Sequence, residues 1–317
     1  MKLKPSLYLA ISLIFGIGAS ILYYAQGQRR RPPMRKHKAI EVKKWQAVPS
    51  TKKLPHKSKH ELSLSNDHIN IEANGIPEHL VGQFPNHGNP HKITLQEYKL
   101  KLNKNPKILD KAIPLHNDTG IGPPNTPFGI AINGVLFDPG TAEFWNGDRK
   151  LDWNYEALSG AVRLGVDSNN AHVQPNGAYH YHGLPHGLLK KLKVSKTKHS
   201  PLIGYAMDGF PVYALFGHKD PKDIKSPIVE LKSSYQLKKG TRPQPPKGPG
   251  GKYDGTFSKD YEYVKGSGDL DECNGRFIIN KDFPEGTYAY FLTNSWPVIP
   301  RYFRAEPLKL RTTRRRR

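Results

Sequence analysis

Residues 128–137 read Phe-Gly-Ile-Ala-Ile-Asn-Gly-Val-Leu-Phe, which places an Asn-Gly pair between two apolar runs. Asn and Gly both tolerate the positive φ angles that the two-residue turn of a β-hairpin requires. An Asn-Gly pair in this setting is the strongest short hairpin signal that a sequence offers. The stretch therefore predicts two antiparallel strands joined at Asn133-Gly134.

Runs with the period of a β-strand continue on both sides of this hairpin. Leu62, Leu64, Ile69 and Ile71 alternate with polar residues around a turn at 65–67, which predicts an earlier pair of strands. Short apolar runs bounded by turn residues predict further strands over 178–182, 202–206, 212–216, 276–279 and 287–292.

Helix signals are few. Leucines at helical spacing follow Pro185 and predict a helix over 184–194, because proline is well tolerated in the first turn. A second short helix is predicted over 95–102. The chain is therefore expected to be mainly β, sandwich-like and antiparallel, with a few short helices and one domain over residues 61–308.

The composition excludes several classes of site. A single Cys in 317 residues rules out an internal disulfide and any metal site built from four cysteines. The signatures G-x-x-x-x-G-K-[ST], G-x-S-x-G and H-E-x-x-H do not occur, so the commonest nucleotide, serine-hydrolase and zinc-protease motifs are absent. We therefore expect no nucleotide cofactor.

The net charge of +22 lies mostly outside the predicted domain. Residues 28–60 hold 12 Lys and Arg with one Glu, and residues 309–317 hold 6 Lys and Arg without an acid. These segments have few apolar residues, which predicts a disordered basic linker and a disordered basic tail. Clustered basic residues favour an anionic membrane surface or envelope polymer as partner, whereas nucleic-acid binding is the weakest interpretation.

The first 27 residues have the pattern of an export signal. Lys2 and Lys4 precede an uncharged stretch that runs to Gln28, long enough for a signal peptide or a membrane anchor. Small residues at Ala25 and Gly27 suit a cleavage site. Both alternatives export the domain, so a periplasmic or secreted location is expected.

The sharpest chemical feature is His180-Tyr181-His182. On a strand both imidazoles point to one face, while Tyr179 and Tyr181 point to the other. Their Cα atoms are then about 6–7 Å apart, so both rings reach one ion. Imidazole suits copper, zinc or iron. The alternative is an ordinary strand whose histidines make hydrogen bonds.

Additional ligands are available near this pair and in an acidic turn. We take the candidates to be His172, His186, Asp271, Glu272 and Cys273. The turn equally fits an interpretation without metal, in which Cys273 is buried as a small apolar residue.

Four more polar residues are weaker candidates. Asp138 and Glu143 could act as general acid or base, although turn chemistry explains both equally well. Asp208 precedes Gly209 and is expected to make a tight turn. Asn274 follows the acidic turn directly, and this position makes it a further candidate site residue.

Five segments containing these residues resemble the YHYH domain family in the same order. They are residues 137–140, 171–175, 177–183, 208–213 and 270–275, and the resemblance covers about 128–304. It implies an exported bacterial protein and brings no established activity with it, so no catalytic residue is carried over. Many members have a His where this chain has Ala289, which implies one ligand fewer or the use of His172 instead.

Two functions fit these observations. The first is an exported domain that binds one transition-metal ion through His180 and His182. The second is a non-catalytic module of the cell envelope that presents tyrosines and Trp296 to a polysaccharide or peptide. Metal content distinguishes the two.

Overall fold

The structure, a computed structural model, describes residues 46–115 and 126–308. These residues belong to one unit of the chain, residues 37–317. The predicted leader, residues 28–45 of the basic linker and the basic tail lie outside the described residues, and those expectations stay predictions. The rest of the predicted linker is not disordered, because Val48 and Lys52 form bridges to Asp167 and Val81 of the domain. None of the helices in the two described ranges has the length and apolar character that a membrane crossing requires.

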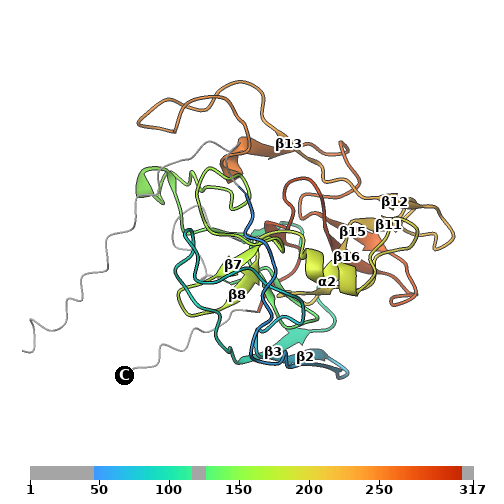
Figure 1. The fold of residues 1–317 in the computed structure, drawn as a ribbon. Coiled ribbons are helices and arrows are strands. Elements are labelled where there is room, and N and C mark those ends of the chain that lie inside the picture. Colours follow the sequence, from blue (N-terminus) through green and yellow to red (C-terminus); the bar gives the residue numbers. More distant parts are fainter. Residues whose placement is uncertain (1–45, 116–125, 309–317) are drawn as a thin grey trace, which may run out of the picture. The chain divides into compact units, whose positions relative to one another are not determined.

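The fold is mainly β, as predicted (Figure 1). Its largest sheet has eight strands in the order β15-β16-β10-β9-β5-β6-β8-β7. Two neighbouring pairs, β6 with β8 and β10 with β16, are parallel, so the sheet is mixed and the expectation of a wholly antiparallel fold is wrong. The strands are β5 (Gly129–Ala131), β6 (Leu136–Phe137), β7 (Ala171–Val173), β8 (Tyr179–Tyr181), β9 (Gly204–Ala206), β10 (Pro211–Ala214), β15 (Gly275–Ile278) and β16 (Thr287–Leu292).

The predicted hairpin over 128–137 is the antiparallel pair β5 and β6, in which Ile130 lies opposite Leu136. Its turn differs from the expected type, because only Gly134 takes a positive φ, of 78°. Asn133 instead uses its side chain: its Oδ1 accepts a hydrogen bond from the amide of Val135. The predicted hairpin is therefore confirmed. Asn133 stabilises the turn through its side-chain oxygen and does not adopt the expected positive φ.

A separate sheet is built from β1 (His60–Leu64), β2 (His68–Ala73) and β3 (Tyr98–Asn103). The first two are the predicted hairpin around 65–67. The helix predicted over 95–102 is wrong, because β3 pairs with β2 and buries Leu100 and Leu102 on one face. Their spacing of two is the period of a strand, and pairing with β2 decides the structure.

The one helix predicted correctly is α2 (His186–Lys191), shorter than the predicted 184–194, with Pro185 as its N-cap residue. The strand predicted over 212–216 ends early, because Leu215 takes a φ of 63° between β10 and β11. The remaining elements are β4 (Ile113–Pro114), β11 (Phe216–His218), β12 (Ile228–Glu230), β13 (Tyr235–Leu237), β14 (Tyr261–Tyr263), β17 (Tyr302–Phe303) and the 3-10 turns η2 (Trp145–Gly147) and η3 (Ser258–Asp260).

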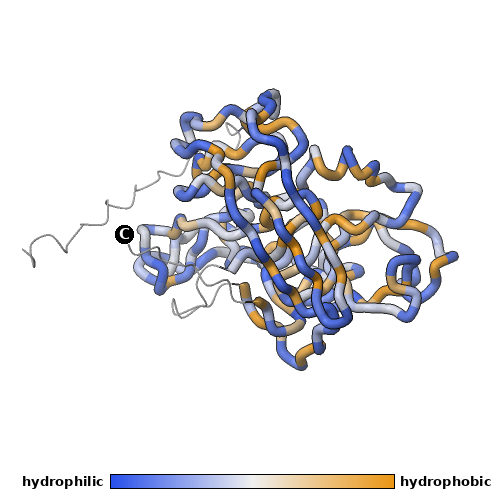
Figure 2. The backbone as a smooth tube through the Cα atoms, turned by 90° about the horizontal axis from the view of Figure 1, so that it is seen from below, coloured by the Kyte–Doolittle hydropathy of each residue, from blue (hydrophilic) through white to orange (hydrophobic). Residues whose placement is uncertain are grey.

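Tyrosines of β8 and β16 lie in the core. Tyr179, Tyr181 and Tyr290 are fully buried, and Tyr288 is nearly so. Figure 2 shows that hydrophobic and hydrophilic residues alternate along much of the chain. The interpretation of these four tyrosines as a surface for polysaccharide or peptide is therefore wrong. They fill the interior because their rings bury large apolar areas, while their hydroxyls find polar partners.

The burial of β3 leads to a first prediction. Leu64, Ile69 and Leu102 form one row across the three strands, but Leu102 is 0% exposed and Leu64 is 57% exposed. Leu102→Ala should lower the free energy of unfolding by about 2–5 kcal/mol. Leu64→Ala, the matched control, should change it by less than about 0.5 kcal/mol. Urea unfolding measures both, and equal effects would contradict the assignment of β3.

Candidate metal centre

A tight hairpin brings the first two histidines together. β7 and β8 are antiparallel, and His172 lies directly opposite His180. The turn between them contains Gly177, whose φ is +85°, and the side chain of Asn176 accepts a hydrogen bond from the amide of Ala178. Paired residues of an antiparallel ladder share one face of the sheet, so both imidazoles project from the same side.

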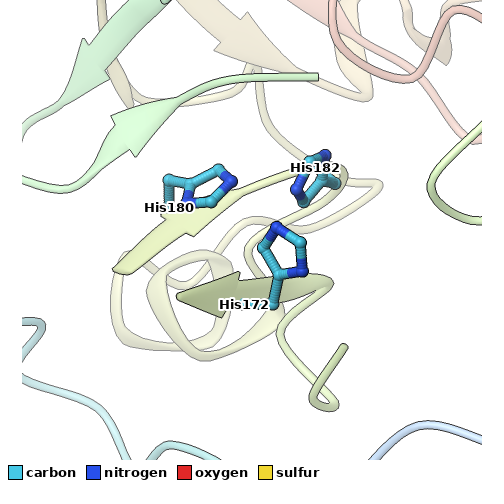
Figure 3. Close-up of side chains that lie close together, drawn as sticks. All are labelled: His172, His180 and His182. Carbon is cyan, nitrogen blue, oxygen red and sulfur yellow. The ribbon is translucent and has the colours of Figure 1, made fainter. Parts of the chain in front are cut away.

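His182 follows β8 and completes a group of three. Its amide donates to the carbonyl of Asn170 over 2.7 Å, which continues the pairing of the two chains for one residue beyond the strands. The ring centres of His172, His180 and His182 are 4.5–4.7 Å apart, and the three rings gather at one point in Figure 3. Among the described residues this is the one group of three or more metal-ligating side chains that could hold an ion.

Backbone carbonyls orient two of these rings. His172 Nδ1 lies 3.0 Å from the carbonyl oxygen of Leu164, and His180 Nδ1 lies 3.1 Å from that of Ala178. Each Nδ1–H therefore donates to its carbonyl. In this tautomer Nε2 carries no proton, and its lone pair is free to bind a metal ion. A metal-binding His nearly always has such a bond at its other nitrogen. The hydrogen bonds therefore prepare both rings as ligands.

Burial keeps the group uncharged. Desolvation lowers the pKa of His172 to about 3, with the neighbouring His180 adding to the shift. Desolvation also lowers the pKa of His180 to about 4. The pKa of His182 falls well below its usual value because of burial, reinforced by His172 and His180. Neutral imidazole is the form that binds a metal ion, so protons do not compete for these rings at neutral pH.

His182 has no ordinary role in the fold. It is 2% exposed, and within the described ranges neither of its ring nitrogens makes a hydrogen bond. The carbonyl of Pro139 opposes the fall in its pKa but forms no bond of normal geometry. A buried polar group without a partner costs about 1–3 kcal/mol, so an unsatisfied imidazole between two others indicates a ligand.

The opposite face of β8 fixes the strand in place. The Tyr179 hydroxyl donates to Asp167 over 2.7 Å. The Tyr181 hydroxyl accepts from Asn133 over 2.9 Å and lies 2.6 Å from His79 Nε2. Both tyrosines, predicted as candidate site residues, therefore anchor the strand behind the histidines and do not line the group.

The structure places the other predicted ligands elsewhere. His186 is exposed at the start of α2. Asp271 accepts hydrogen bonds from Tyr288, and Glu272 pairs with Arg304 over 3.1 Å. Cys273 is fully buried in the main core, which matches the alternative interpretation of the acidic turn.

Four weaker candidates occupy turns. Asp138 accepts from the side chain of Gln174 over 2.9 Å, and the Glu143 carbonyl accepts from Asn154. Asp208 is buried in the predicted tight turn, where desolvation raises its pKa to about 6. That shift is opposed by hydrogen bonds from Tyr290 and three amides. Asn274 has a φ of 54° and donates to the Phe291 carbonyl, which fits a structural turn.

The comparison with protein families agrees with this geometry. Residues 111–305 match the model of the family described as YHYH protein. The chain belongs to the YHYH family. The family's name repeats the residues 179–182, whose two histidines lie in the group of three and whose two tyrosines anchor the strand. No curated protein and no solved structure matches the chain.

Arg301, which the sequence did not single out, lies near the histidine group. Arg301 donates to the Pro139 carbonyl over 3.1 Å and to Glu156 over 2.6 Å, and its charge contributes to the lowered pKa of His182. It lies 119 or more residues along the chain from the histidines, and no motif marks it.

The lowered pKa values predict how stability depends on pH. The pKa of His180 is about 4 in the fold and about 6.5 in the unfolded chain. Between these values the unfolded state binds more protons, so the free energy of unfolding falls as the pH decreases. In metal-free protein His180→Gln should reduce this loss between pH 6.5 and 4 by about 3 kcal/mol. Urea unfolding at several pH values measures the difference, and parallel curves for the two proteins would contradict it.

Proposed function

We propose that this YHYH domain binds one transition-metal ion through His172, His180 and His182. The single observation that carries the proposal is the group of three uncharged rings close together, with His180 and His182 buried, His172 partly buried, and both nitrogens of His182 without a hydrogen bond in the described ranges. The candidate nitrogens lie within 4.8 Å of one another. Small ring rotations would bring them to the separations of about 3.4 Å that follow from bonds of 2.0–2.1 Å in a tetrahedral site.

The ligand set favours copper, zinc or iron. Neutral imidazole suits these ions, whereas calcium and magnesium prefer oxygen ligands. Three protein ligands also differ from a closed structural site, which uses four. The ion would keep one position for a small molecule, and there it would supply Lewis-acid or redox chemistry. Ala289 is buried on β16, which four strands separate from β8 in the large sheet, so His172 joins the group independently of that position.

We also propose that the domain is exported and that its basic segments attach it to an anionic surface. The support comes from the chain ends: Lys2, Lys4 and the uncharged stretch to Gln28, followed by the basic residues of 28–60 and 309–317. A location outside the cytoplasm leaves the metal site open to ions of the envelope.

Elemental analysis of the purified full chain tests the metal site. We expect one copper, zinc or iron ion per chain after dialysis, and its loss in His180→Ala/His182→Ala. His186→Ala is the matched control. His186 lies close to His182 in the sequence, but it is exposed and does not belong to the group of three. Less than about 0.1 ion per chain in the parent protein, or equal content in the double variant, would overturn the proposal.

Cell fractionation tests export. In a Gram-negative host the full chain should appear in the periplasm, the membrane fraction or the medium, and a chain without residues 2–27 should stay in the cytoplasm. A full chain found only in the cytoplasm would contradict the proposed location and leave the metal site unaffected.

A further inference from the structure

The three ligands bring no negative charge to the proposed site. Imidazole binds a metal ion in its neutral form, and in the described ranges no carboxylate joins the group of three histidines. Asp138, which follows β6 beside them, accepts a hydrogen bond from Gln174 and is not a member of the group. A divalent ion here would be a buried charge without compensation, which is strongly unfavourable.

A fixed cation adjoins the group. Arg301 donates through Nη1 to the carbonyl of Pro139, the same carbonyl that faces His182. Its Nη2 is 2.6 Å from Glu156, and the two side chains are 13% and 9% exposed. Ser258 donates to the second oxygen of Glu156. The Arg301 and Glu156 charges cancel, so this pair brings no net negative charge that would compensate an ion on the histidines.

Arg301 and the neighbouring Trp296 each have an unsatisfied donor. Within the described ranges eight buried side-chain nitrogens and oxygens lack a hydrogen-bond partner, and four of them belong to His182, Arg301 and Trp296. Those of Arg301 and Trp296 are N–H donors, Nε and Nε1. The guanidinium carbon of Arg301 lies 5.7 Å from the centre of the Trp296 ring. Since buried donors are nearly always paired in native proteins, the unpaired Nε of Arg301 indicates an acceptor beside the guanidinium that faces the histidine group.

We infer that a small carboxylate binds between the histidine group and Arg301, completing the coordination of the ion and accepting a hydrogen bond from Arg301 Nε. This inference rests on the proposed metal site and names the class of ligand that its open position takes. A carboxylate supplies the missing negative charge, and its two oxygens can serve the ion and the planar guanidinium together. Glu156 holds Arg301 in place and is a positioning residue.

Acetate binding to the cobalt-loaded full chain tests the inference. Cobalt(II) reports its ligands through visible absorption, and elemental analysis gives its stoichiometry separately. We expect acetate to change the spectrum of the parent protein with a saturable affinity. Arg301→Met/Glu156→Gln removes both charges together, which avoids leaving either one buried and unpaired. This variant should keep one cobalt per chain and bind acetate at least tenfold more weakly.

A second pair of residues provides the matched control. Arg304 and Glu272 also form an arginine–glutamate pair, 3.1 Å apart, and no histidine of the group contacts either one. Arg304→Met/Glu272→Gln should bind acetate within twofold of the parent protein. Equal acetate affinity in the Arg301 variant, or no spectral response in a fully loaded parent, would overturn the inference while the metal site stands. A parent protein that takes up neither cobalt nor copper, zinc or iron would overturn both.

Discussion

The arrangement of this domain depends on keeping three imidazole rings neutral, with His180 and His182 buried and His172 partly buried. Desolvation lowers the pKa of His172 to about 3 and of His180 to about 4, so none of them competes for protons in the physiological range. Two backbone carbonyls fix the tautomers of His172 and His180, and the ring of His182 makes no hydrogen bond of normal geometry within residues 46–115 and 126–308. Rings held in this way stabilise the fold less than apolar side chains would, which is a cost typical of functional sites.

Hydrogen bonds on the opposite face of β8 stabilise the strand that carries His180. Tyr179 donates to the buried Asp167, and Tyr181 bonds to Asn133 of the β5–β6 hairpin. The strand that carries the histidines is therefore anchored by hydrogen bonds and aromatic packing on one side, which leaves the other side available for chemistry. Rigid elements of this kind hold ligands more accurately than loops do.

Local patterns made the histidine pair predictable from the sequence. Alternation on a strand puts His180 and His182 on one face, and the hairpin turn at 174–177 places His172 opposite His180. The acidic turn at Asp271 could not be placed by the same reasoning, because its partners Tyr288 and Arg304 come from distant positions. Arg301 could not be predicted for the same reason. The helix predicted over 95–102 was wrong because pairing with β2 decides the structure of β3.

Anomalous X-ray diffraction from crystals soaked in zinc or copper tests the central claim most directly. The account predicts one strong peak between the three rings, about 2.0–2.1 Å from a nitrogen of each of His172, His180 and His182. A peak at another place on the domain, or none between these rings at full soak, would contradict it.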